Sequence, residues 1–256
     1  MKRIPLLILV ILVVLTVFLN LKNNNPKGPL VILLNKQGIQ EAKRLTYRLY
    51  LFGMLPIADA VFEYKGQEEY LNKEAYHIKV TARNLDYLSF AVKGSAVLDS
   101  YIDVKDGNPF FFRQELKISG KADVIREIRY DQKEHIMYLN GERRKILSDT
   151  QDPVSGLFFK IREIDFNKRN DLEININTNQ KNYIFVAKAD KSYLTARGSK
   201  HGVINLSGEV KRQEENNPYH RSKVSMVLAT EKKNIPLLIR VFTAGLPVNI
   251  RLINIE

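Results

Sequence analysis

The most regular pattern along this chain is an alternation of apolar and polar residues with a period of two. It is clearest in Tyr76–Ala82, Leu172–Ile176, Val224–Leu228 and Val248–Ile255. Alternation of this kind is typical of strands that bury one face in a core and expose the other to water. Turn residues such as Asn140-Gly141 separate the runs at short intervals. The pattern predicts a mainly β protein, an antiparallel meander curled into a barrel or half-barrel.

The stretch Asp152–Ile161 lacks the period of two, and its pattern predicts a helix. Asp152 is a favourable N-cap, and Pro153 at the first helical position loses no useful N–H. The apolar residues that follow share one face at helical spacing, namely Val154, Leu157, Phe158 and Ile161. We expect one short helix of two to three turns packed against the sheet, with Ser155 satisfying backbone groups at its start.

The N-terminus has a different pattern, an almost unbroken apolar run. Lys2 and Arg3 precede Ile4–Leu19, as in an export signal. No small residue marks a cleavage site near the end of the run, so a retained transmembrane anchor is favoured over a cleaved signal peptide. We expect a signal-anchor or signal peptide over residues 1–21, a linker over 22–36 and a single β-barrel-like domain over 37–256. Secretion after cleavage is the alternative.

Composition narrows the chemistry. The 256 residues contain no cysteine, which excludes disulfides, thiolate catalysis and cysteine metal sites. Lys and Arg number 40 against 28 Asp and Glu, a net charge of +12. This excess favours anionic partners, which for an exported protein are lipid headgroups or anionic envelope polymers. Export argues against nucleic acid. The alternative is an ordinary solvated surface.

Motifs for catalysis are not found. The four histidines lack metal-ligand spacing, and there is no nucleophile elbow and no phosphate loop. We expect no metal, no cofactor and no enzymatic activity, with His77 and His220 on outward faces. A hydrolase acting on envelope polysaccharide stays open as an alternative, because its two carboxylates need to be close only in space.

Aromatic residues are the candidates for ligand binding. They recur in the strands and in the predicted helix, as Phe111, Tyr130, Tyr138, Phe158 and Phe159. One interpretation is an apolar cavity between sheet and helix that holds an acyl chain; the other is ordinary core packing. The triplet Phe110–Phe112 places rings on both faces of its strand.

Several motifs, in order, resemble a bacterial envelope family known as domain of unknown function 3108. They comprise Leu45–Arg48 with Gly53 and Pro56, Ala60–Glu63, Ala75–Ile78, Asp99–Asp103, Asp152–Leu157 with Pro153 and Ser155, Val224–Thr230 and Pro236–Arg240. The resemblance implies a secreted or envelope protein, periplasmic in location. Family members are often cleaved, and this chain departs from them because its apolar run predicts an anchor in the inner membrane over residues 4–21. The resemblance also implies a fold similar to the lipoprotein carriers LolA and LolB, and gives no catalytic residues.

Three functions remain open. The first is a non-enzymatic envelope protein that binds a lipid or other amphipathic ligand in its half-barrel. The second is a structural or scaffolding protein with a solid core, and the third is the polysaccharide hydrolase. A continuous apolar pocket of a few hundred cubic ångströms would favour the first, and a filled interior the second.

Overall fold

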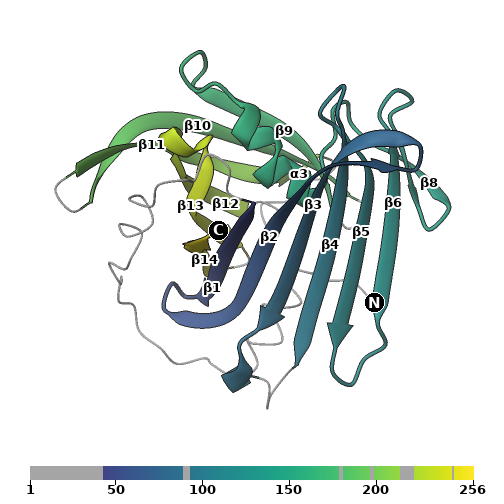
Figure 1. The fold of residues 1–256 in the computed structure, drawn as a ribbon, viewed down its shortest axis with the longest axis horizontal. Helices are drawn as coiled ribbons and strands as arrows, with labels where there is room; N and C mark the ends of the chain where they lie inside the picture. The colour runs from purple at the N-terminus through teal and green to yellow at the C-terminus, as the bar shows by residue number, and fades with distance from the viewer. Residues whose placement is uncertain (1–42, 89–92, 179–180, 197–198, 214–221, 244) are drawn as a thin grey trace.

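The fold is one large antiparallel sheet with a short helix against it (Figure 1). The computed structural model describes residues 43–88, 93–178, 181–196, 199–213, 222–243 and 245–256. Within them the sheet has 14 strands, in the order β8-β7-β6-β5-β4-β3-β2-β1-β14-β13-β12-β11-β10-β9. The sheet is open, because β8 and β9 are not paired with each other. The mainly antiparallel β prediction is therefore confirmed, and a closed barrel is not.

The first half of the chain forms eight consecutive strands. Their bounds are β1 Arg44–Leu51, β2 Leu55–Tyr70, β3 Lys73–Asn84, β4 Gly94–Asp103, β5 Pro109–Ile118, β6 Val124–Asp131, β7 Ile136–Leu139 and β8 Glu142–Lys145. A 3-10 turn, η2 (Asp86–Leu88), follows β3. The predicted tight turn joins β7 to β8, with φ of 47° at Asn140 and 93° at Gly141. Positive φ at both residues is what a two-residue hairpin turn requires.

The second half adds six strands. Their bounds are β9 Asp171–Thr178, β10 Lys181–Ala196, β11 Ser199–Arg212, β12 Ser222–Ala229, β13 Ile235–Thr243 and β14 Leu246–Ile255, with the 3-10 turn η5 (Thr230–Lys232) before β13. The two halves join where β14 pairs with β1, from Leu45↔Ile255 to Leu51↔Val248. This junction, which we call the seam, pairs strands that are about as far apart in sequence as the domain allows.

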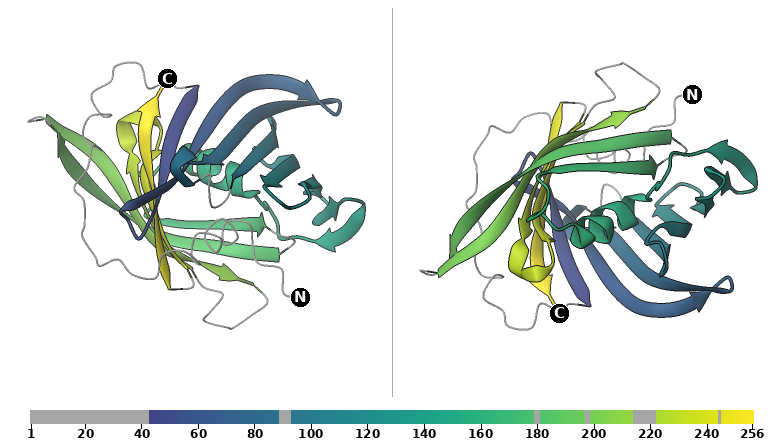
Figure 2. Two further views of the ribbon diagram at one scale, coloured as in Figure 1. Left: turned by 90° about the horizontal axis from the view of Figure 1, so that it is seen from below. Right: turned by 90° about the horizontal axis from the view of Figure 1, so that it is seen from above.

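The segment between β8 and β9 crosses the open side of the sheet, and we call residues 146–170 the strap. It carries α3 (Pro153–Phe158) and the 3-10 helix η3 (Lys160–Glu163). Figure 2 shows these helices lying between the two halves, on the concave side of the sheet. The strap also pairs with β9 through a parallel bridge between Gln151 and Ile176.

The helix begins as predicted and is shorter than predicted. Asp152 accepts hydrogen bonds from the backbone N–H groups of Val154 and Ser155, and the Ser155 side chain accepts from the Asp152 N–H. Two to three α turns were expected, but the α-helix ends at Phe158 and continues as the single 3-10 turn of η3. The tighter turn still buries Ile161 completely.

The main hydrophobic core lies on the concave side of the sheet. One continuous cluster of buried apolar residues joins strands from both halves to the strap, which contributes Val154, Phe158, Ile161 and Phe166. Within the described residues, no helix is long and apolar enough to cross a membrane. The predicted anchor (1–21) and linker (22–36) lie outside the described residues.

Candidate functional site

The interior beneath the strap is occupied by aromatic rings. Phe158 lies 3.8 Å from Phe62 and 5.6 Å from Tyr47, measured between ring centroids. The Tyr64 hydroxyl donates to the Phe158 carbonyl at 2.8 Å, and the Tyr47 hydroxyl donates to the Pro236 carbonyl at 2.9 Å. The two Tyr hydroxyls thus find partners inside the core, as buried hydroxyls generally must. Helix and sheet therefore meet directly at this point, with rings in contact.

The structure separates the five aromatic residues predicted to bind a ligand. Tyr130, Phe158 and Phe159 all belong to the core cluster or pack against it. Phe111 lies on the opposite face of the sheet, in a small cluster with Ala75 and Phe110. Tyr138 is 40% exposed. The register explains the split, because Tyr130 pairs with Met137 and Arg129 pairs with Tyr138, so the two tyrosines point to opposite faces.

A buried polar network attaches the start of α3 to the sheet. Asp152 is fully buried, and its second carboxylate oxygen accepts from the Ser100 hydroxyl at 2.6 Å. Burial raises the pKa of Asp152, against the opposing effect of these hydrogen bonds. Burial also raises the pKa of the Tyr130 hydroxyl, with the nearby charge of Asp152 adding to it. The role of this network is structural: its groups are buried, and its hydrogen bonds hold the start of α3 on β4.

The strap is also fixed by amide side chains. Gln151 donates to Asn108 at 2.7 Å, and Gln132 donates to the Thr150 carbonyl at 2.8 Å. On the β9 side, the Gln151 N–H donates to the Asn175 carbonyl at 2.8 Å. The Asn175 side chain donates to the Ser148 carbonyl, also at 2.8 Å. These bonds connect both halves of the sheet through the strap, so the open side is closed by polar contacts rather than by strand pairing.

Some apolar residues at the margin of the core are only partly covered. Leu49, Leu98, Val241 and Ile250 pack against the core cluster but are only half-buried. In the register, Leu98 pairs with the buried Val80, and Leu49 pairs with Ile250. Residues of the strap itself, such as Phe159, are half-buried as well, so partial burial is not confined to positions away from α3.

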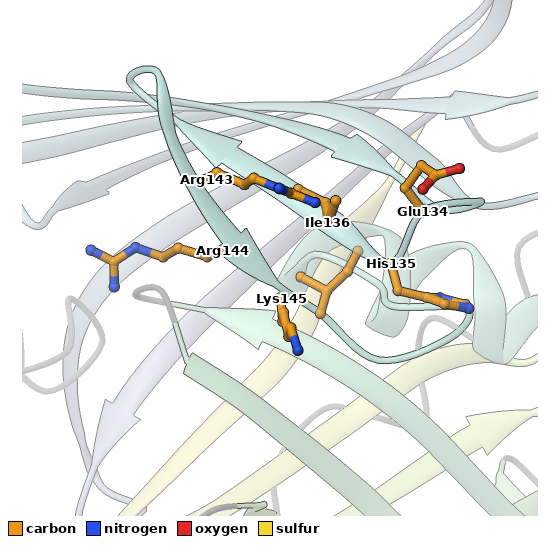
Figure 3. A pocket seen from close by; sticks show the side chains of 7 residues that line it. Glu134, His135, Ile136, Arg143, Arg144 and Lys145 are labelled. Atoms are coloured by element: carbon orange, nitrogen blue, oxygen red, sulfur yellow. The ribbon is translucent and has the colours of Figure 1, made fainter.

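A cationic hollow lies at the base of the β7–β8 hairpin (Figure 3). It has a volume of about 550 Å³ and is lined by Glu134, His135, Ile136, Arg143, Arg144, Lys145 and Ile146. Figure 3 shows Arg143 and Lys145 on β8 near Ile136, while the side chains of Arg144, His135 and Glu134 extend away from these two. We call this cationic hollow the hairpin hollow. Sequence reasoning missed it, although the charge run Glu142–Lys145 directly after a tight turn was a visible signal.

A second hollow of about 440 Å³ lies between the strap and β11. Phe166 and Val203 lie at its apolar part, and Lys191 donates to Asn167 at 3.0 Å at its polar part. Neither hollow is an enclosed apolar cavity of the kind that holds an acyl chain.

His77 is less exposed than a surface histidine would be. Its side chain is 11% exposed and contacts two carboxylates, with Nδ1 2.9 Å from Glu68 and Nε2 2.9 Å from Asp99. Its ring stacks on Tyr101 at 4.4 Å, and Tyr101 stacks on Tyr70 at 3.8 Å. Burial, followed by the charge of Asp99, raises the pKa of Tyr101 to about 12. The outward direction of His77 was predicted correctly, but these partners on the two neighbouring strands could not be read from a single alternating run.

Neither hollow brings together two of the acidic residues that the predicted hydrolase would need. Glu68 and Asp99 both bind His77 and line neither hollow, and each hollow has one carboxylate residue, Glu134 or Asp165. Within the part of the chain that the structure describes, no group of three or more histidine, cysteine or acidic residues could hold a metal ion.

The motif residues Gly53, Pro56 and Pro236 lie at structural positions. Gly53 has a φ of 73° in the turn between β1 and β2, and its carbonyl accepts from Arg251 at 3.2 Å. The Pro56 carbonyl accepts a hydrogen bond from the Tyr87 hydroxyl. Pro236 lies at a register shift between β12 and β13 and accepts the bond from Tyr47. The motifs that suggested a family are therefore turns, bulges and a cap, which determine shape.

Comparison with known proteins agrees with this view. A crystal structure described as a beta-barrel-like protein of domain of unknown function DUF1849, from Brucella abortus, superposes with a TM-score of 0.55 at 11% identity. The match covers 83% of this chain and 96% of that one, and it shows a shared fold. No match was found among curated proteins. The model of the family "Protein of unknown function (DUF3108)" matches residues 46–245, most of the described sheet. The chain belongs to the DUF3108 family.

Proposed function

We propose that this protein is an exported, non-enzymatic envelope protein that works through its surface, in a structural or scaffolding role. Its N-terminal apolar run holds it in the inner membrane, and the sheet stands in the periplasm. The observation that carries the proposal is the filled interior: Phe158 contacts Phe62 and Tyr47 at the centre of one continuous core. A carrier that encloses an acyl chain needs an apolar cavity of several hundred cubic ångströms there.

The binding of a lipid or other amphipathic ligand is the second candidate. It is favoured by one observation, the half-buried Leu49, Leu98, Val241 and Ile250 on the core side of the sheet. A ligand there would lie at the margin of the core, against these four residues. The polysaccharide hydrolase has no comparable support, because neither hollow brings two acidic residues together.

Photo-crosslinking separates the two candidates. Full-length protein in a neutral detergent is labelled with a fatty acid that carries a photoreactive group, and the labelled peptides are mapped by mass spectrometry. We expect label on the apolar N-terminal run and none on peptides that contain Phe62, Leu98 or Phe158. Label on the apolar N-terminal run serves as the positive control, since it shows that the probe reacts with an apolar segment of the chain.

The outcome of the mapping is decisive for the proposal. Label on Leu98 or Val241 in the wild-type protein would support the amphipathic ligand and overturn the surface role. Label near Phe62 and Phe158 would show that α3 moves aside, which a filled and static core does not permit.

A further inference from the structure

The hairpin hollow combines cationic side chains with an apolar floor. Ile136 and Ile146 are 6% exposed and lie beneath it, while Arg143 and Lys145 occupy β8 with one residue between them. Residues two apart on a strand share a face. The Ile146 N–H donates to the His135 carbonyl at 2.9 Å, which fixes the end of β8 against the segment that leads into β7.

Of the three Lys and Arg residues that line the hairpin hollow, one has a carboxylate partner among the described residues. Arg144 forms a salt bridge with Glu142 at 2.8 Å, whereas Arg143 and Lys145 form none within the described residues. Glu134 lines the hollow, but in Figure 3 its carboxylate lies away from Arg143 and Lys145. The two positive charges are therefore available to an anion from solvent. An arginine fork and an ammonium group are the donors that most often bind phosphate oxygens.

A further arginine, Arg129 on β6, lies in the same cross-strand row as Arg143. Arg129 pairs with Tyr138 across β6 and β7, and Tyr138 pairs with Arg143 across β7 and β8. An exposed tyrosine thus has an arginine directly opposite on each side. Side chains opposite each other on antiparallel strands lie about 5 Å apart, so this row presents two guanidinium groups near one polar ring.

We propose that the hairpin hollow binds a phosphate group carried by an envelope molecule. Arg143 and Lys145 donate to the phosphate oxygens, and Ile136 with Ile146 contacts the apolar part next to the phosphate. This inference deepens the proposed function, because it gives the surface role a site and a ligand class. A glycerophospholipid headgroup and a phosphate-containing polymer both carry this chemistry.

The competing explanation is protection of a sheet edge. β8 is the last strand of the open sheet, and charged side chains on an edge strand discourage pairing with other chains. Edge protection requires charge alone, at any position along the strand. A phosphate site requires Arg143 and Lys145 in particular, so substitution distinguishes the two explanations.

The test uses the full-length chain in a neutral detergent. Inorganic phosphate is titrated at low ionic strength and its binding followed by calorimetry. We expect saturable binding that weakens at least about tenfold in Arg143→Ser/Lys145→Ser, since the loss of even one charge-assisted hydrogen bond has that effect. The matched control, Lys200→Ser/Lys223→Ser, removes the same charge from exposed positions on β11 and β12 and should bind as the wild type does.

A second arm identifies the source of the phosphate. The protein in phosphatidylcholine nanodiscs is mixed with phosphatidylcholine vesicles that contain or lack phosphatidylglycerol. Association that needs phosphatidylglycerol and is lost in Arg143→Ser/Lys145→Ser identifies a lipid headgroup. Phosphate binding without vesicle association identifies a soluble or polymeric phosphate, and both results support the site.

Two results would overturn the inference: no saturable phosphate binding by the wild type, or an equal loss in both double variants. Either would leave the charge of β8 as edge protection. Urea midpoints of the variants confirm that each is folded, which is expected because Arg143, Lys145, Lys200 and Lys223 are all exposed. The photo-crosslinking result is independent of this test, so failure of the phosphate site does not alter the conclusion about the interior.

Discussion

At the scale of single residues, Asp152 joins the start of α3 to the sheet. It caps α3 through two N–H groups and binds Ser100 from β4, all without contact with water. Asp152→Ala should destabilise the fold by about 2–4 kcal/mol, because it removes a cap and leaves the buried Ser100 hydroxyl without its acceptor. Urea denaturation measures the change. Ser119→Ala, at an exposed turn, is the control and should have little effect.

The raised pKa of Asp152 predicts a dependence of stability on pH. The folded protein holds a proton on this carboxyl at pH values where the unfolded chain, with the ordinary value of 3.8, has released it. Its contribution to stability is therefore largest below pH 3.8 and is lost as the pH rises through the raised pKa. Asp152→Asn keeps an acceptor for the cap and removes the ionisation. We expect the stability of this variant relative to the wild type to increase with pH, measured by urea denaturation at several pH values. An unchanged difference would contradict the buried, raised pKa.

Phe158 and Tyr138 should differ sharply in their contribution to stability. Phe158 is 3% exposed and Tyr138 is 40% exposed, although the sequence grouped them as members of one site. Phe158→Ala should cost about 3–5 kcal/mol through loss of burial and the cavity left behind. Tyr138→Ala should cost less than about 1 kcal/mol, as surface substitutions usually do. Similar losses in urea denaturation would contradict the assignment of these two rings to opposite faces.

At the scale of elements, β10 and β11 are held at an unusually close approach. Gly208 pairs with Ala187, and a Cβ added to Gly208 would lie 2.0 Å from the Val186 carbonyl oxygen and 2.6 Å from Ala187. Backbone atoms cannot move aside without breaking the ladder. Gly208→Ala should therefore destabilise the protein by more than about 3 kcal/mol. Ser207→Ala, exposed on the same strand, is the matched control, and equal urea midpoints for the two variants would contradict the close contact.

The elements themselves were largely predictable from the sequence. Strands followed from alternation, the β7–β8 turn from Asn140-Gly141, and the start of α3 from Asp152 and Pro153, because each depends on residues close in sequence. The environment of His77 was not predictable, since its partners come from β2 and β4. The same holds for the ligand site: alternation gives two faces, but which aromatic residues share a face depends on the register between strands. Whether the interior is filled depends on how far the sheet curls around the strap.

At the scale of the whole molecule, stability depends on the seam. β14 pairs with β13 on one side and β1 on the other, so it holds the two halves of the sheet together. A chain that ends before Leu246 leaves β1 and β13 as open edges and splits the core. We expect it to lose cooperative unfolding and to aggregate, as measured by circular dichroism and light scattering. A chain that lacks only Glu256 loses its backbone bonds to Arg44 and should still unfold cooperatively.

The seam also has a consequence for biosynthesis. β1 is the first described strand to leave the ribosome, and β14, its partner, is made some 200 residues later. At about 5–20 residues per second, ten seconds or more pass in which the backbone groups along one edge of β1 have no partner strand. The sheet therefore cannot be completed before β14 has been made, and until then the edge of β1 is open to pairing with other chains.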